Sequence, residues 1–444
     1  MSTFGRIFGG SVVLGAGVAA AVAALVIVGP GGRTATVAAT GDGGARSAAV
    51  ASASNALSGS IASTQAQLRD EPRNWLAWAT LGAAYVQQGR ATADPTFYPK
   101  AQLALQRSLQ LNRDDNFVAM VGLGTLAAAR HDFSGAMRWS RQALRIDPQS
   151  AAAYSVLTDA DDELGRYADA VRAVQHAVDL SPGVSTFARV SYVRELHGDV
   201  RGATLAMQQA REAATDAQDI AFCDYYLGEL AFGAGNLAHA ATYYGDGLRV
   251  QPSAPMLLEG QAKVEAARGQ IAEAVRDYTS AVQMLPLPQY AVEFGDYLSS
   301  LHRTSDAARQ YDLVGVEERL FRANGVNNDL DVTLFAAEHG QASEAAAAGR
   351  AEWSRRHSII VADAYAWALH KAGHDNEALR YARFATSLRL RSPLYYFHKG
   401  SIERALGDMS AARSDLTRAL RLNPYFSPLH APQARTALRE LSAP

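Results

Sequence analysis

Small, aromatic and turn-forming residues recur at an interval of 34 positions along most of this 444-residue chain. Within most intervals an alanine is followed four positions later by an aromatic or aliphatic residue, one helical turn away on the same face, although the eighth unit has Gly349 there. The recurrence predicts one structural unit used many times. The pairs include Ala136 and Ala170, Pro148 and Pro182, Gly235 and Gly269, Tyr244 and Tyr278, and Ala378 and Ala412.

Each recurring residue type has a physical reason to occupy its place. The glycine stands where a turn between two helices often needs a positive φ. The alanine marks the closest approach of the two helices, where a larger side chain would push them apart. The proline follows the second helix, which it cannot continue. The unit is therefore predicted to be two helices, A and B, joined by a tight turn.

The first copy carries the clearest family signature. Trp78, Leu81, Gly82 and Tyr85 fit the pattern W-x2-L-G-x2-Y, and this stretch resembles the front half of a tetratricopeptide unit. The resemblance covers about residues 70–424. It implies an all-α fold, a right-handed tetratricopeptide-repeat superhelix (α-solenoid) of about ten helix-turn-helix units, preceded by one N-terminal transmembrane or signal helix.

The units are expected in two stretches, 65–314 with repeats one to seven and 315–441 with an irregular repeat, two regular repeats and a capping helix. An insertion at 90–98 separates the helices of the first unit, and an extra helical stretch is expected within 315–325. The weak pattern over 288–350 leaves open whether the array is continuous or splits into two lobes. The first three expected units are 74–113, 115–148 and 149–182, followed by a degenerate fourth unit that ends in the extension 212–219. Two regular units then close at Pro252 and Pro286. The last four units are 288–314, 327–357 and two units up to Pro424, with a capping helix at 431–441.

The N-terminal region differs from the rest. Residues 7–29 carry no charge and are long enough to cross a bilayer, so residues 1–30 are predicted to be a transmembrane anchor or signal segment. Small residues at 37–39 would suit signal cleavage. Residues 31–64, mostly Ala, Gly, Ser and Thr, predict a flexible linker. The array would then lie outside the cell membrane or be secreted; an incidental apolar tail on a cytosolic protein is the alternative.

Composition narrows the function classes. A formal net charge of −2 gives no overall positive field to attract nucleic acid or an anionic membrane. Cys223, the single cysteine, permits neither an intrachain disulfide nor a cysteine-rich zinc site. The preference for Arg over Lys, with much Ala and Gly, is typical of a GC-rich bacterial genome, which favours an actinobacterial source.

Motifs for reaction chemistry are missing from the sequence. It has no phosphate loop, no nucleophile elbow and no H-E-x-x-H zinc helix. His370 and His374 flank the turn glycine Gly373, so they need not share a helix face. We therefore predict no catalytic residue, no cofactor and no metal site.

The family resemblance implies a concave groove lined by helix A of each unit. It places acidic and aromatic side chains along the middle of that groove. Such a groove would suit a basic or amphipathic extended peptide, unless these side chains only solvate the inner face. Where the family's carboxylate-binding site has Lys and Asn, this chain has Ala, Thr, Asp, Tyr and Glu instead, which argues against a carboxylate clamp. The candidate groove residues are Asp159, Asp162, Tyr192, Glu195, Tyr225, Glu229, Lys263 and Asp296.

The leading hypothesis is a non-enzymatic scaffold that binds a protein or peptide partner and is tethered to or exported across the membrane. One alternative is an enzyme or enzyme subunit with a site in the irregular region 315–357, where Glu338, His339, Glu352 and His357 are the candidates. A cytosolic regulator built on the same repeats is the other alternative.

Overall fold

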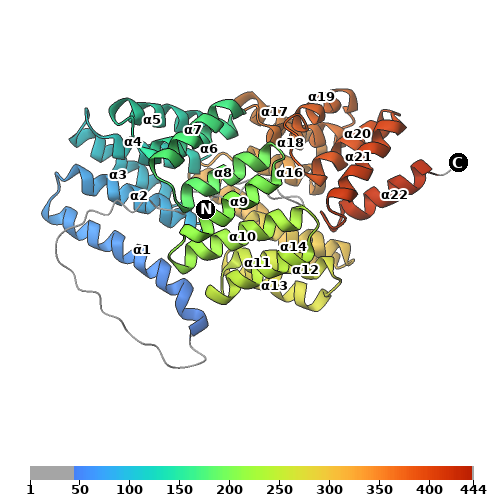
Figure 1. Ribbon diagram of the computed structural model, residues 1–444, viewed down its shortest axis with the longest axis horizontal. Coiled ribbons are helices and arrows are strands. Elements are labelled where there is room, and N and C mark those ends of the chain that lie inside the picture. The colour runs from blue at the N-terminus through green and yellow to red at the C-terminus, as the bar shows by residue number, and fades with distance from the viewer. Residues whose placement is uncertain (1–44, 443–444) are drawn as a thin grey trace.

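The computed structural model describes residues 45–442, with side chains from residue 57 onward, and this part of the chain folds into helices without any strand (Figure 1). The helices are α1 (Ala45–Asp70), α2 (Trp75–Ala91), α3 (Phe97–Leu111), α4 (Phe117–Ala129), α5 (Phe133–Ile146), α6 (Ala151–Glu163), α7 (Tyr167–Leu180), α8 (Val184–Leu196), α9 (Val200–Ala213), α10 (Ala217–Gly233), α11 (Leu237–Val250), α12 (Pro255–Ala267), α13 (Ile271–Met284), α14 (Pro288–Ser300), α15 (Thr304–Ala323), α16 (Asp329–His339), α17 (Ala342–Arg355), α18 (Ile359–Lys371), α19 (Asp375–Ala385), α20 (Pro393–Ala405), α21 (Met409–Leu422) and α22 (His430–Ser442).

Helices α2 to α21 form ten consecutive packed pairs, each an A helix followed by a B helix. The residues expected at the crossing points are fully buried, including Ala136, Ala170 and Ala240. Turn glycines such as Gly165 and Gly235 have the positive φ that the spacing predicted, 75° and 74°. In two turns a histidine replaces the glycine, and His131 and His302 also adopt a positive φ. The repeat arrangement predicted from the 34-residue period is therefore confirmed.

The structure changes two expectations about helices. Helix α1 occupies residues 45–64 of the stretch predicted as a flexible linker, because its alanine-rich sequence has high helix propensity. Ile61 and Leu68 are buried against the first unit. The stretch expected to be helical within 315–325 is helical up to Ala323, but it continues α15 and is not an extra helix; Val314 and Phe321 are buried there.

The array winds back on itself, so that units eight to ten pack beside units two to five (Figure 1). Hydrogen bonds and an ion pair join residues 191 to 196 positions apart. At 34 residues per unit, this offset corresponds to roughly five to six units in one turn of the superhelix. Successive turns are therefore in direct contact, with no open gap between them at these places.

We call this contact the seam. It joins the A–B turns of units two to five to the later loops 324–328, 356–358, 386–392 and 423–429. His131 Nδ1 lies 2.6 Å from the carbonyl oxygen of Asn327, and the Ile359 N–H donates to the hydroxyl of Tyr167 at 2.7 Å. The amide of Asn423 donates to the carbonyl of Phe232 at 2.8 Å.

The irregular middle of the array is bridged by side chains. Tyr311 on α15 stacks on His339 of α16, with ring centroids 4.2 Å apart. The hydroxyl of Tyr311 also donates to Asp296 on α14 at 2.9 Å. Units seven and eight are thus held together although the closing proline and turn glycine of a regular unit are missing there.

The membrane prediction concerns residues 1–30, which lie outside the described residues. Within 45–442, no helix combines the length and the apolar character needed to span a bilayer.

Candidate interaction surfaces

The residues predicted to line a groove lie on the inner helices, and the structure covers them. Asp162, Tyr192, Glu195, Tyr225, Glu229 and Asp296 are buried, while the side chains of Asp159 and Lys263 are 14% and 11% exposed. Burial of A helices is most complete in α18, where every residue from Ile359 to Leu369 is buried. The role of the groove candidates in binding stays a prediction.

At the third and fourth units, the acidic side chains are met by an arginine. The guanidinium of Arg189 on α8 contacts both carboxylate oxygens of Asp159 on α6, at 2.8 and 2.7 Å. Such a bidentate pair is the strongest geometry for an arginine and a carboxylate. Burial raises the pKa of the neighbouring Asp162 well above its usual value, and the negative charges of Asp159 and Glu163 raise it further.

A second network fills the inner face at units five and six. The ammonium of Lys263 lies 2.7 Å from Glu229 and 2.7 Å from Glu259. The hydroxyl of Tyr225 donates to Glu259 at 3.3 Å, and that of Tyr244 donates to Glu229 at 2.5 Å. These carboxylates are therefore engaged within the protein rather than presented to a basic peptide.

The residues of the enzyme hypothesis have separate partners. Glu338 contacts Trp367 and lies 3.5 Å from Lys371, whereas His339 lies 2.9 Å from Asp296. Glu352 pairs with Arg355 and Arg356. His357 is exposed beside the ring of Trp353. The four candidates thus do not converge on one reacting position.

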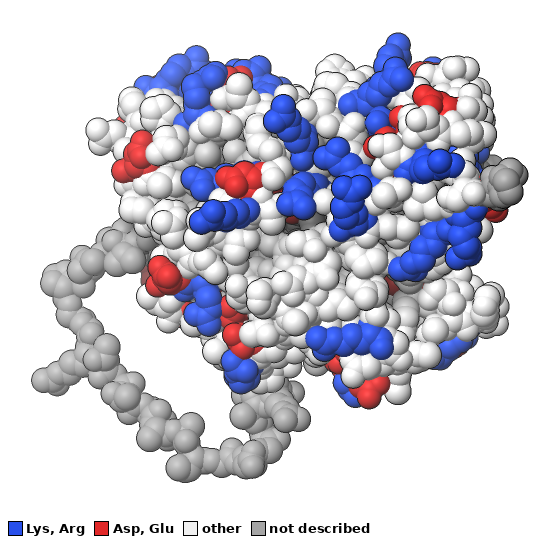
Figure 2. Space-filling view, turned by 45° about the vertical axis from the view of Figure 1, so that its right-hand side comes forward, with Lys and Arg blue, Asp and Glu red and all other residues white. Residues whose placement is uncertain are grey.

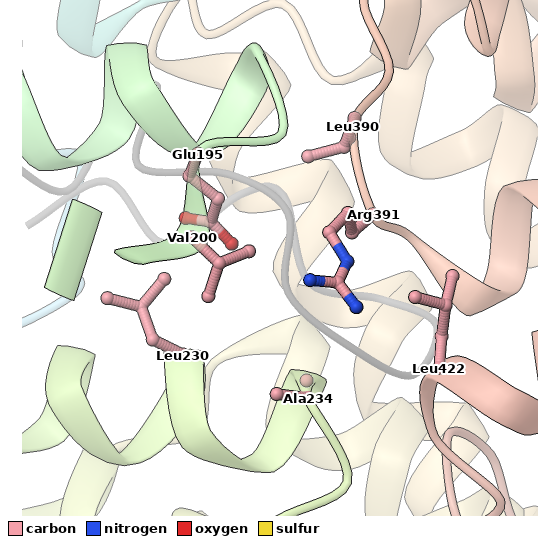
Figure 3. Close-up of a pocket in the computed structure, with 8 residues that line it drawn as sticks. Glu195, Val200, Leu230, Ala234, Leu390, Arg391 and Leu422 are labelled. Carbon is pink, nitrogen blue, oxygen red and sulfur yellow. The ribbon is translucent and has the colours of Figure 1, made fainter. Parts of the chain in front are cut away.

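A small pocket opens on the seam between units four and five and units nine and ten (Figure 3). Glu195 and Arg391 face it from opposite sides, and its remaining lining is mostly apolar. The cavity volume is about 10 Å³, close to the space that one water molecule needs. It is too small for a metabolite or cofactor. The lining residues are Glu195, Val200, Leu230, Gly233, Ala234, Leu390, Arg391 and Leu422.

The sequence missed the partners that bury the acidic residues. Glu229 with Lys263, and Tyr225 with Glu259, are pairs 34 residues apart, so the repeat period itself carried a signal for them. Glu163 and Arg356 are 193 residues apart and pair across the seam. No local pattern indicates that contact, because it depends on how far the superhelix rotates per unit.

The outer surface near the C-terminus has a different character. Residues 379–427 contain nine Lys and Arg residues against three acidic ones, although the whole chain is slightly acidic. Figure 2 shows that Lys and Arg outnumber Asp and Glu on the side of the molecule where these units come forward. We call one group of exposed arginines here the basic edge: Arg389, Arg391, Arg418, Arg421 and Arg435.

The fold and these surfaces define an all-helical repeat protein over the described residues. Residues 394–426, within the tenth unit, match the family model described as tetratricopeptide repeat, which is the family that the spacing predicted. Proteins with this repeat generally act as scaffolds for protein interaction.

Solved structures give weaker likenesses. PilF of Pseudomonas aeruginosa is 19% identical over 48% of this chain and 98% of its own, with a TM-score of 0.38. A tetratricopeptide repeat protein of Parabacteroides merdae is 16% identical over 59% and 99%, with a TM-score of 0.34. One from Thermus thermophilus is 19% identical over 44% and 99%, with a TM-score of 0.36. Such low TM-scores carry no argument about this array. No curated protein matches the chain.

Proposed function

We propose that this chain is a non-enzymatic scaffold that binds a protein partner on its outer surface. The observation that supports this most is the burial of the inner helices together with their internally paired charges. The pocket on the seam has a volume of only about 10 Å³, close to the space that one water molecule needs. A partner would therefore meet the exposed B helices and the loops at the edges of the array.

We further propose that residues 1–30 tether the array to a membrane or direct its export. The support is the uncharged stretch 7–29 and its flanking Arg6, as in a span with its N-terminus inside. Helix α1 (Ala45–Asp70) would then act as a helical spacer close to the array, since a helix rises about 1.5 Å per residue.

The test is crosslinking in intact cells, followed by capture of the tagged full chain and mass spectrometry. The expected result is a reproducible protein partner that crosslinks to residues on the outer surface, and a mature N-terminus that distinguishes anchor from cleaved signal. Crosslinks only within the chain would contradict the scaffold proposal. Recovery of the uncleaved chain in the soluble fraction alone would contradict tethering and export.

A further inference from the structure

The basic edge is one continuous surface built from three segments. Arg391 in the α19–α20 loop and Leu422 at the end of α21 line the same pocket (Figure 3). The guanidinium of Arg418 lies 4.1 Å from the ring centroid of Tyr396, and burial raises the pKa of Tyr396 while the positive charges of Arg418 and Arg391 oppose that rise. These contacts place arginines from the loop and from α21 side by side.

The edge continues into the α21–α22 loop. Arg421 is three residues beyond Arg418, the spacing of neighbours on one helix face. Arg435 on α22 donates a hydrogen bond to the carbonyl oxygen of Pro424, next to the exposed ring of Tyr425. The loop carrying Arg389 is held against the Gly198 turn, because a Cβ at Gly198 would lie 2.4 Å from the Arg389 carbonyl oxygen.

Within the described part of the chain, no ion pair of 4 Å or less joins an arginine of the basic edge to a carboxylate. The ion pairs of units nine and ten use other residues: Lys399 with Asp415 and Glu403, and Arg404 with Glu440. Of the acidic side chains nearby, Glu195 lines the same pocket as Arg391 but is buried. The exposed face of α21 carries Arg413, Arg418 and Arg421 and no exposed carboxylate after its N-cap.

We propose that the basic edge is the docking surface for an acidic segment of a protein partner. This inference rests on the proposed scaffold function and names the chemistry of the partner. Guanidinium groups suit carboxylates because their fixed N–H geometry allows bidentate hydrogen bonds. Tyr425, 40% exposed beside the edge, adds an aromatic contact. Arginine and tyrosine without exposed lysine is the composition of a protein interface more than of a surface for nucleic acid or lipid.

A binding measurement tests the proposal on the full chain. The probe is a dye-labelled peptide that alternates Glu with Tyr, and its control has Gln at every Glu position. We expect the acidic peptide to bind and the Gln peptide not to bind. Binding of the acidic peptide should weaken as salt is raised, because exposed charges are screened.

Variants locate the site. Combining Arg391→Glu with Arg421→Glu should weaken peptide binding by about tenfold or more, because the new carboxylates at the edge would repel the carboxylates of the peptide. A matched control, Arg107→Glu with Arg145→Glu, reverses two exposed arginines on α3 and α5 and should change binding by less than about twofold. Arg391→Gln with Arg421→Gln serves if the Glu variant does not fold, as judged by circular dichroism, and should weaken binding in the same direction.

The other outcomes overturn the inference. Equal binding by the edge variant and the control variant would show that the acidic peptide attaches elsewhere. Edge-dependent binding of phosphatidylglycerol vesicles or of oligothymidine, with no binding of the peptide, would assign the edge to a different class of partner. If the crosslinked cellular partner survives the edge substitutions, the scaffold function stands and the proposed docking surface fails.

Discussion

The A–B turns of this array fall into two groups that have the same backbone conformation but differ in the residues packed against them. Gly198 and Gly235 have φ of 77° and 74°, and Gly373 and Gly407 have φ of 79° and 82°. A Cβ at Gly198 would lie 2.4 Å from the carbonyl oxygen of Arg389, on the next turn of the superhelix. A Cβ at Gly373 or Gly407 would meet nothing within 4 Å.

The same local motif therefore serves two purposes. In every unit the glycine allows the chain to reverse between helices. In units three to five it also lets a loop from the next superhelical turn approach closely, which closes the seam. The two groups of turns, seam and free, can be separated by substitutions that harm one and spare the other.

The largest effect is expected at the buried ion pairs of the seam. Arg356 contacts Glu163 on α6 and Glu352 on its own helix turn, and all three are buried. Arg356→Ala leaves the buried Glu163 without its cation and leaves Glu352 with Arg355 alone, so we expect the free energy of unfolding to fall by about 3 to 5 kcal/mol. Chemical denaturation followed by circular dichroism measures this loss.

Arg172 is the matched control for that substitution. It pairs with Asp169 on the exposed face of α7, with 67% of its side chain accessible. Arg172→Ala should cost less than about 1 kcal/mol because solvent screens exposed pairs. If Arg356→Ala proved as mild as Arg172→Ala, the seam would not depend on its buried charges.

A direct comparison of turns comes next. Gly165→Ala and Gly373→Ala both force an alanine into a left-handed conformation, at a cost of about 1 to 2 kcal/mol. At Gly165 the new Cβ would also lie 2.3 Å from the carbonyl oxygen of His357. Displacing that loop should add about 1 to 3 kcal/mol. Equal losses of unfolding free energy at the two sites would mean that the loop at His357 can move away from the new Cβ at no energetic cost.

The sequence predicted those parts of the fold that one unit determines. Alanine at the helix crossing and glycine at the turn depend on contacts within a unit, and their recurrence every 34 residues made them visible. Most of helix α1 was missed because alanine and serine with little else were interpreted as a linker, although alanine strongly favours helix. The apolar residues Ile61 and Leu68 indicated only a helical turn or two at its end, where both are buried.

For the candidate groove, the sequence predicted which helices carry the residues but not how those helices are covered. Asp159, Glu229 and Asp296 were correctly placed on inner helices, but the sequence did not reveal that the inner face is covered. Contact between successive turns depends on the rotation from each unit to the next, which adds up over roughly five to six units before Arg356 reaches Glu163. The sequence of a single repeat does not determine that rotation.

Acid should weaken the seam through His131. Burial, together with the positive charge of Arg356, lowers the pKa of this ring to about 4. The unfolded chain, with a histidine pKa of about 6.5, then binds more protons than the folded chain between these values. Stability is full above a pH of about 6.5 and falls as the pH drops towards 4, by about 3 kcal/mol from this group.

The substitution His131→Gln tests this slope. It keeps a donor for the carbonyl oxygen of Asn327 but removes the titration. His430, the first residue of α22, also has a pKa lowered to about 4 by burial. Its titration remains in the His131→Gln variant, which should therefore flatten the pH dependence of stability only in part. Denaturation midpoints measured between pH 4 and pH 7 give the result, using His302→Gln at an exposed turn as control. An unchanged slope would exclude His131 as a titrating group of the seam.

The smallest effect compares two asparagines at the same place in their units. Asn423 follows α21 and donates to the carbonyl of Phe232 across the seam, whereas Asn112 follows α3 and donates to Asp115 in its own loop at 3.0 Å. Asn423→Ala removes the bond across the seam, but the Phe232 carbonyl keeps its bond from the Gly235 N–H, so the cost should be about 1 kcal/mol. Asn112→Ala, at an exposed loop, should stay within about 0.5 kcal/mol. Hydrogen exchange of the α10–α11 turn should accelerate only in the Asn423 variant, because only that substitution loosens the contact between successive turns. Acceleration in both variants would mean that each asparagine stabilises its own loop and not the seam.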